Sequence, residues 1–171
     1  MLYKIKRKQN NSAMCLVCGL KNNFGLKARF FETESGILIG EFAAKDFHQS
    51  YLNRMHGGAI AAILDETAGR AINIAEPNAW GVTTELNLTY RRPTPYGEIL
   101  YCIGELADNG SRMFVGTSKI VDANGVVYAE AMGKFAKLPI EKIVGFSLDH
   151  TQWFLENENI RTQIEISNWQ C

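Results

Sequence analysis

A histidine and two glycines, followed by a run of small and apolar residues, form the segment of this chain best suited to chemistry. His56-Gly57-Gly58 opens the run, and Asp65 lies nine residues after His56 within it. A helix that begins on glycines presents bare backbone N–H groups, which stabilise developing negative charge. A carboxylate buried further along the same helix is a candidate base. The sequence therefore predicts a site that attacks a carbonyl with water.

The spacing of these groups indicates that one chain does not supply the whole site. Nine helical residues at ~1.5 Å and ~100° each place Asp65 roughly 13 Å along the axis from His56 and about half a turn around it. The Gly57 amide and the Asp65 carboxylate of one chain therefore cannot reach the same small group. Either they serve different purposes or a second copy of the chain supplies the missing half. Small residues at helical spacing from Asp65 allow close approach of another backbone or a ligand; they are Ala61, Ala62, Ala68 and Gly69. We hypothesise a composite site across a two-fold dimer interface.

The surrounding pattern predicts one long helix among strands. We expect the helix from Gly57 to about Ala75, ended by Pro77-Asn78. Alternating polarity and turn signals predict strands at residues 26–33, 37–43, 80–90, 98–107, 112–121 and 126–137. Residues 1–23 resemble an irregular or partly helical arm, and residues 146–155 the start of an amphipathic helix. The helix is too apolar to lie on a surface, so we expect an α+β fold with an antiparallel sheet wrapped around it.

Composition favours one compact domain that does not act on nucleic acid or membranes. The 171 residues are 46% hydrophobic and carry a formal net charge of +0. Zero net charge argues against nucleic acid or an anionic membrane as the main partner, and no apolar run is long enough to span a membrane. The basic start, Met1 to Lys8, lacks the apolar core of a secretory signal. We therefore expect a cytoplasmic protein.

Two of the four cysteines have the spacing of a zinc site. Cys15 and Cys18 are separated by two residues, but no second pair completes the ligand set, because Cys102 falls in an expected strand and Cys171 ends the chain. A redox pair is a further alternative. We favour packing thiols in a reducing compartment, and we expect no metal or other cofactor.

Three separated motifs resemble the acyl-CoA thioesterases of the hotdog fold, particularly the phenylacetate-pathway type and the human thioesterase-superfamily members. The motifs are Cys15-Leu16-Val17-Cys18-Gly19 with Asn22 and Gly25-Leu26, His56-Gly57-Gly58 through Asp65, and Glu85 to Pro93 followed by Pro95-Tyr96-Gly97. The resemblance covers residues 15–138. It implies a long central helix wrapped by an antiparallel sheet of five to six strands. We accordingly expect an N-terminal arm at 1–23, a hotdog thioesterase domain at 24–138 and a C-terminal extension at 139–171.

The resemblance also implies catalytic roles by position. Asp65 matches the acidic residue that acts as general base or nucleophile, and Gly57 matches the residue whose backbone N–H polarises the thioester carbonyl. His56 is implied to orient the site, and Thr83 matches a Ser/Thr position that helps hold the attacking water. In such enzymes the glycine side and the acid side come from opposite subunits. The implied reaction hydrolyses an acyl-CoA to a free acid and coenzyme A, a step of lipid metabolism.

Five further residues are candidates for binding the substrate: Ser50, Asn53, Gly58, Arg91 and Arg92. Many relatives carry an Asn six residues before the His, where this chain has Ser50, and the neighbouring Gln49 and Asn53 are alternatives for that role. Arg91 and Arg92 are candidates for the coenzyme phosphates, although exposed arginines at a strand end are common. We expect Glu66 to pair with Arg70 on the surface rather than to act in catalysis.

Two other function classes stay open. A hotdog dehydratase or hydratase acts on acyl chains with a His and an acid, usually within a His-Phe-Pro type motif that His56-Gly57-Gly58 does not match. A non-catalytic acyl-CoA-binding or sensing protein is the other alternative. The sequence leaves the acyl group undetermined; it implies a homodimer, with a homotetramer of two dimers as a family expectation. In the tail, Trp153 and Trp169 suggest docking, either over a pocket mouth or at a subunit contact.

Overall fold

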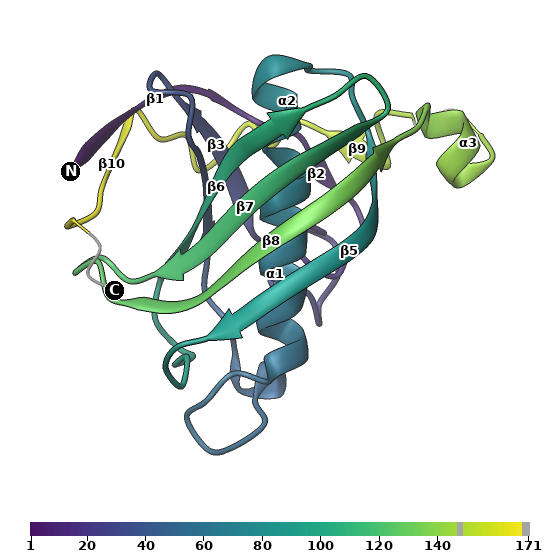
Figure 1. The fold of residues 1–171 in the computed structure, drawn as a ribbon. Helices are drawn as coiled ribbons and strands as arrows, with labels where there is room; N and C mark the ends of the chain where they lie inside the picture. The colour runs from purple at the N-terminus through teal and green to yellow at the C-terminus, as the bar shows by residue number, and fades with distance from the viewer. Residues whose placement is uncertain (147–148, 169–171) are drawn as a thin grey trace.

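A curved antiparallel sheet surrounds one long helix in the computed structural model, which describes residues 1–146 and 149–168 (Figure 1). The helix α1 (Gly57–Arg70) is followed after Ala71 by α2 (Ile72–Ala75). The main sheet has eight strands in the order β10-β1-β3-β4-β6-β7-β8-β5. These strands are β1 (Leu2–Lys8), β3 (Arg29–Thr33), β4 (Leu38–Phe42), β5 (Gly81–Tyr90), β6 (Leu100–Asn109), β7 (Met113–Val121), β8 (Val127–Lys137) and β10 (Gln163–Glu165). The remaining elements are β2 (Asn11–Ser12) paired with β9 (Trp153–Phe154), and the short helices η1 (Asp46–His48) and α3 (Ile140–Val144).

The predicted α+β class and the central helix on an antiparallel sheet are confirmed, but the predicted strand number is wrong. The sheet has eight strands rather than five to six, because β1 and β10 extend it beyond β3. The expectation of an irregular or partly helical arm is wrong for the same reason. Tyr3 and Ile5 alternate with lysines, which is a strand pattern, and both contribute to a core cluster shared with β10.

The predicted helix at residues 146–155 is also wrong where the chain is described. Residues 147 and 148, and Trp169 in the tail, lie outside the described residues. After residue 148 the chain turns and forms β9 rather than a helix, and further along β10 pairs with β1. Ile164 and Ile166 are buried there. The proposed boundaries between arm, central domain and extension stay a prediction.

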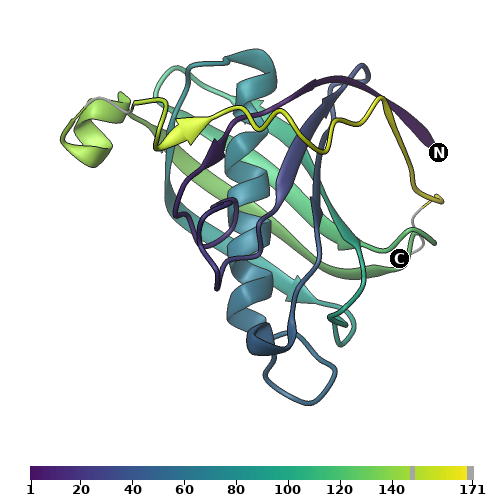
Figure 2. The same cartoon turned by 180° about the vertical axis from the view of Figure 1, so that it is seen from behind.

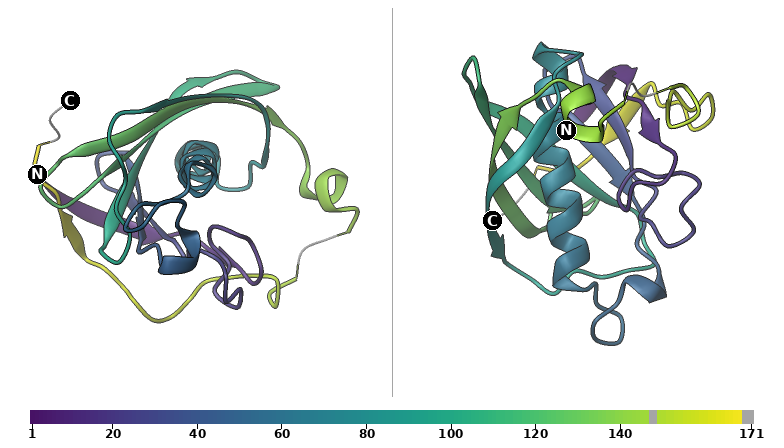
Figure 3. Two further views of the ribbon diagram at one scale, coloured as in Figure 1. Left: turned by 90° about the horizontal axis from the view of Figure 1, so that it is seen from below. Right: turned by 90° about the vertical axis from the view of Figure 1, so that its right-hand side faces the viewer.

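The helix is held by close backbone contact with the sheet. A Cβ atom at Gly116 of β7 would lie 2.1 Å from the carbonyl oxygen of Ala68, so only glycine allows this approach. One turn earlier on the helix, the Ser118 hydroxyl donates a hydrogen bond to the Leu64 carbonyl oxygen at 2.8 Å. A view along the helix axis shows the sheet curving around α1 (Figure 3). The two contacts fix the depth and rotation of α1, and therefore the directions of its side chains.

Both faces of the sheet are buried near β3. Phe30 packs against the helix in the largest core cluster, whereas Phe31 points to the other face and packs with residues of β1 and β10. On the open side of the curve, β2 and β9 pair beside the helix, and the chain adjoining them runs across it (Figure 2). The segments outside the central helix and strands therefore cover the helix face that the sheet leaves open. Every helix within the described residues is too short or too polar to cross a membrane.

The strand β5 forms one edge of the sheet and is poorly covered. It pairs only with β8, and none of its ten residues is fully buried. Leu86 and Leu88 are partly buried, while Val82 and Tyr90 are exposed. A long edge strand with unpaired backbone groups and apolar side chains is a site where another strand can pair.

Candidate active site

Asp65 and Thr83, both predicted as catalytic residues, lie in direct contact. The Thr83 hydroxyl donates a hydrogen bond to Oδ1 of Asp65 at 2.9 Å, which joins the middle of α1 to the start of β5. Asp65 is partly buried in the single chain, so the expectation of a buried carboxylate is wrong for the isolated subunit. The hydroxyl holds one carboxylate oxygen in place, and Asp65 lines the neighbouring cavity.

A β-bulge turns Thr83 toward the helix. Strict alternation along the strand places Thr83 and Leu86 on opposite faces. In the structure Thr83 is opposite Phe135 and Leu86 is opposite Gly133, two positions on the same face of β8, because the register shifts between Thr83 and Glu85. The extra residue at this bulge directs the Thr83 hydroxyl at Asp65.

The surroundings of Asp65 make it a stronger base than an exposed aspartate. Burial is the largest influence and raises the pKa of the carboxyl group. The hydrogen bond from Thr83 acts in the opposite direction, and the negative charge of Glu66 adds to the rise. A carboxylate with a raised pKa accepts a proton from water more readily than an exposed aspartate does.

A cavity of about 240 Å³ lies beside this pair. Asp65 and Thr83 line it, together with Cys15 from the N-terminal segment and Trp153 from β9. The Trp153 ring lies 5.0 Å from that of Trp80 and 4.8 Å from the guanidinium carbon of Arg70. The aromatic pair closes one side of the cavity, so the predicted docking of Trp153 is onto the chain's own pocket.

The first turn of α1 presents the other half of the predicted chemistry. His56 is the N-cap, and its Nδ1 accepts a hydrogen bond from the Gly58 N–H at 2.9 Å. The Gly57 carbonyl oxygen accepts a hydrogen bond from the Tyr90 hydroxyl at 3.0 Å. Among the described residues, no hydrogen-bond acceptor contacts the Gly57 N–H. This group is a free donor at the positive end of the helix dipole.

A second cavity, of about 390 Å³, lies at this end of the helix. Four predicted site residues line it: Ser50, Gly57, Arg91 and Arg92. The cavity beside Asp65 and Thr83 shares none of its lining residues. The predicted residues therefore fall into two groups, one at the start of α1 and one beyond its middle, and one chain does not bring Gly57 and Asp65 together.

The predicted substrate-binding residues already have contacts within the chain. Arg91 forms an ion pair with Glu130, and Nη1 of Arg92 donates to the Val127 carbonyl oxygen at 2.7 Å. Ser50 and Asn53 lie in an exposed loop, where Asn53 has a left-handed φ of 62°. Gly58 is engaged with His56 as described above. A role for these residues in binding coenzyme A stays a prediction.

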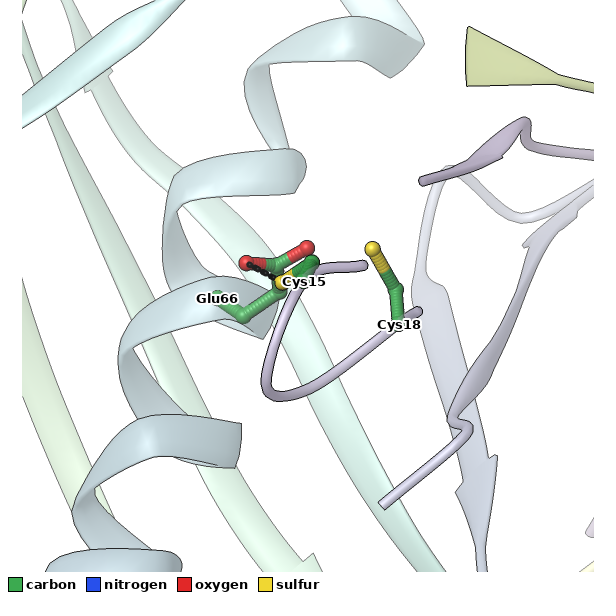
Figure 4. A group of neighbouring side chains, drawn as sticks. All are labelled: Cys15, Cys18 and Glu66. Carbon is green, nitrogen blue, oxygen red and sulfur yellow. Dashed lines mark hydrogen bonds between the residues drawn. The ribbon is translucent and has the colours of Figure 1, made fainter. Parts of the chain in front are cut away.

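A polar cluster beside Asp65 was not predicted. The predicted pair of Glu66 and Arg70 is present at 2.8 Å, but Arg70 is only 6% exposed and does not lie on the surface. Nη2 of Arg70 also donates to Sγ of Cys18 at 3.0 Å, and Cys15 approaches Glu66 (Figure 4). Two sequence signals, the Cys15-to-Cys18 spacing and the i,i+4 spacing of Glu66 and Arg70, point to parts of this cluster, but only tertiary packing brings them together.

Comparison with known proteins shows which family the chain resembles. Residues 52–129 match a family described as the thioesterase superfamily. Mouse acyl-coenzyme A thioesterase THEM4 is 38% identical over 140 residues, which cover 80% of this chain and 59% of that protein. These matches identify the thioesterase superfamily as the family that the chain resembles. Human acyl-coenzyme A thioesterase 13 is 26% identical over 96 residues, 56% of this chain and 69% of the relative. The chain thus spans less than two thirds of the length of mouse THEM4.

Solved structures of this superfamily have the same fold. A superfamily protein named RHA08564 superposes with a TM-score of 0.65 at 28% identity, over 71% of this chain and 59% of that one. A Bacillus halodurans protein, solved with CoA, has a TM-score of 0.59 at 27% identity, over 66% of this chain and 75% of that one. The E. coli protein PaaI, from the phenylacetic acid degradation operon, shares the fold at 18% identity and a TM-score of 0.59, over 66% of this chain and 80% of that one.

Proposed function

We propose that the chain is an acyl-CoA thioesterase that acts as a homodimer, with Asp65 of one subunit activating water and the Gly57 N–H of the other polarising the carbonyl. The observation that carries the proposal is the hydrogen bond of 2.9 Å between Thr83 and Asp65 at the wall of a cavity. Two of the relatives in the superfamily are named acyl-coenzyme A thioesterases, and a related structure was solved with CoA. These names support the substrate class.

Asp65 supplies the base in this mechanism. One of its carboxylate oxygens is held by Thr83, and the other accepts a proton from a water molecule that attacks the thioester carbon. The raised pKa of Asp65 favours this transfer, and it follows first from burial of the carboxyl group. Coenzyme A leaves as a thiolate of low basicity, so the reaction does not require a strong general acid.

Gly57 supplies the electrophilic half. The carbonyl oxygen becomes negatively charged as water adds, and the free N–H at the start of α1 donates a hydrogen bond to it. The helix dipole adds to the stabilisation, because the positive end of α1 faces the developing charge. His56 caps this end and holds the first turn in the conformation that exposes the N–H. Among the predicted substrate-binding residues, Ser50, Arg91 and Arg92 share the Gly57 cavity, and we place the CoA moiety there; Asn53 and Gly58 flank it.

A second copy of the chain completes the site. Gly57 and Asp65 lie eight residues apart on one helix, about 12 Å along its axis, so a single thioester carbonyl cannot contact both within one chain. The exposed edge strand β5 carries Thr83 near one end and Tyr90, which contacts Gly57, at the other. Antiparallel pairing of β5 with its copy would bring the Thr83 end of one chain close to the Tyr90 end of the other. This arrangement unites the two cavities.

A thiol-release assay tests the proposal. Native chain is incubated with CoA esters of short, medium, long and aryl acids, and free CoA is measured with a thiol reagent. Asp65→Asn keeps the shape of the side chain but removes its basicity, and we expect a loss of roughly 10²–10⁴-fold. Asp108→Asn removes an exposed carboxylate outside both cavities and should retain native activity. If native chain releases no thiol from any ester, the hydrolase proposal fails, and binding without turnover becomes the function to measure.

A further inference from the structure

Two thiols and a carboxylate converge beside the proposed active site without a role in hydrolysis. Sγ of Cys15, Sγ of Cys18 and a carboxylate oxygen of Glu66 all lie within 4.8 Å of one another (Figure 4). Cys15 also lines the cavity that contains Asp65. The inference drawn from this cluster is independent of the proposed function.

A tight turn holds the two cysteines at the separation of a disulfide. The Gly19 N–H donates to the Cys15 carbonyl oxygen at 2.9 Å, which closes one turn of helical type. A Cβ at Gly19 would lie 2.3 Å from that oxygen, so the turn depends on glycine. Cα atoms three residues apart in such a turn are about 5 Å from each other. This separation lies within the range that a disulfide spans without backbone movement.

The turn is anchored to the core rather than free to open. The buried Asn11 side chain donates to the carbonyl oxygens of Cys18 at 2.8 Å and of Ala28 at 2.9 Å. The Leu26 N–H donates to the Leu16 carbonyl oxygen at 2.9 Å. The geometry of the two thiols is therefore set by the fold in the reduced state.

The two thiols differ in access and in surroundings. Cys15 is partly exposed and accepts a hydrogen bond from the Val17 N–H at 3.3 Å, whereas Cys18 is 1% exposed. Nη2 of Arg70 contacts Sγ of Cys18 at 3.0 Å and places a fixed positive charge behind the pair. A molecule that enters the cavity meets Cys15 first and finds Cys18 behind it.

The more accessible of the two thiols also has the lower pKa. The hydrogen bond from the Cys18 thiol lowers the pKa of Cys15 to about 7, while burial and the charge of Glu66 oppose the shift. The hydrogen bond to Cys15 and burial both raise the pKa of Cys18. Cys15 has the lower pKa and is the more accessible thiol, so it is the nucleophile of the pair.

We propose that Cys15 and Cys18 form a redox-active dithiol that exchanges with small-molecule disulfides. The Cys15 thiolate attacks one sulfur of the disulfide, forms a mixed disulfide and releases one small thiolate. Cys18 then gives up its proton, attacks Sγ of Cys15 and releases the second small thiol. The net reaction oxidises the two cysteines to one intramolecular disulfide and reduces one small disulfide to two thiols. Excess small thiol reverses both steps.

A metal ion fits the cluster less well. The part of the chain that the structure describes offers three donor groups here, one fewer than a structural zinc site requires. The Arg70 guanidinium already contacts Cys18 and Glu66, and its Nη1 is held by the Asn10 carbonyl oxygen at 3.0 Å. The ring of Phe30 lies 4.5 Å from its centre. The guanidinium cannot withdraw to admit a cation.

The test equilibrates the full chain in glutathione buffers of increasing oxidised fraction, followed by acid quench, alkylation and peptide mass analysis. Trypsin cleavage after Lys8 and Lys21 releases a peptide, residues 9–21, that contains Cys15 and Cys18 and no other cysteine. We expect this peptide to lose two hydrogens and become resistant to alkylation as the buffer is oxidised, and to recover in reduced buffer. Cys102, fully buried in β6, should stay reduced and serves as the internal control.

Two variants assign the roles. Cys18→Ser should trap Cys15 as a mixed disulfide with one glutathione, whereas Cys15→Ser should leave Cys18 unmodified. Alkylation of Cys15 at pH 7 should be roughly tenfold faster than that of an ordinary thiol, because about half of it is ionised. Retention of both free thiols in the native peptide under fully oxidised glutathione would overturn the proposal, whether or not the variants fold. One bound zinc per purified chain, removed only with loss of fold, would also overturn it.

Discussion

Replacing Gly57 by proline removes the proposed oxyanion donor while leaving the helix intact. Gly57 is the first helical residue after the N-cap, a position where proline fits because its N–H is not needed for the helix. His56 precedes it with φ of −66° and ψ of 137°, the extended conformation that a residue before proline adopts. A Cβ at Gly57 would lie 3.5 Å from the Tyr90 hydroxyl oxygen, which is ordinary contact.

The expected effect is large for activity and small for stability. Loss of a single oxyanion donor lowers kcat by roughly 10²–10³-fold, or about 2.7–4 kcal/mol in the transition state. Among the described residues of the Gly57 turn, the neighbouring Gly58 N–H is already engaged by His56 and cannot substitute. Gly57→Ala keeps the N–H and adds only the methyl group, so it is the matched control and should stay within a few-fold of native activity.

The assay measures kcat and KM for thiol release from the best acyl-CoA ester, together with the thermal midpoint of each variant. A folded Gly57→Pro variant with near-native kcat would refute the assignment of Gly57 as the donor. An equal loss of activity in Gly57→Ala would also refute it, because the donor is retained there.

Three further outcomes follow from the Asp65 site and the tail. Thr83→Val should lower activity about fivefold to tenfold. The hydrogen bond from Thr83 lowers the pKa of Asp65, so its loss should raise that pKa and move the acidic limb of the pH profile to higher pH. The control is Thr84→Val, because the Thr84 hydroxyl contacts only a backbone carbonyl; this variant should leave activity and pH profile unchanged. Burial raises the pKa of Asp65 in the folded state, so the stability of the native chain should fall as pH rises from the ordinary aspartate pKa through the raised value. In thermal melting, Asp65→Asn should therefore be more stable than the native chain at neutral pH and equally stable at low pH. The ion pair with Arg29 lowers the pKa of Glu156 to about 2, so its stabilisation is present above the ordinary glutamate pKa and lost as pH falls to about 2. Urea unfolding of Glu156→Gln should show about 1–2 kcal/mol lower stability at neutral pH and no difference near pH 2; a constant difference at all pH values would contradict this.

The sequence was sufficient for the parts of the fold that depend on local periodicity. The helix from Gly57 onward, the six central strands and the separation of Gly57 from Asp65 all follow from spacing along the chain. The alternation of Tyr3 and Ile5 with lysines is also a strand pattern, but the prediction of an arm missed it. One partner of this strand, β10, lies about 160 residues away, and local periodicity does not report such pairing.

Features that depend on tertiary contacts could not be predicted from these local patterns. Thr83 faces the helix because of a β-bulge, which strict alternation along the strand does not predict. Only the resemblance to hotdog-fold thioesterases pointed to this residue. The convergence of Cys15 with Glu66 joins residues 51 positions apart, and no periodicity reports it. Arg70 matched the i,i+4 pattern of a surface ion pair, yet the tail folds Trp153 over it and buries it. Contacts between residues far apart in the sequence determine these features.

A subunit-complementation experiment addresses the composite site itself. Asp65→Asn and Gly57→Pro homodimers should each be nearly inactive, and the two are unfolded together, refolded and assayed for thiol release. In each mixed dimer one site combines an intact Asp65 with an intact Gly57, so random mixing should restore about a quarter of native activity. Recovery at that level would support a site shared between two subunits. Mixed dimers that form, as shown by mass, but remain as inactive as the parent variants would contradict it.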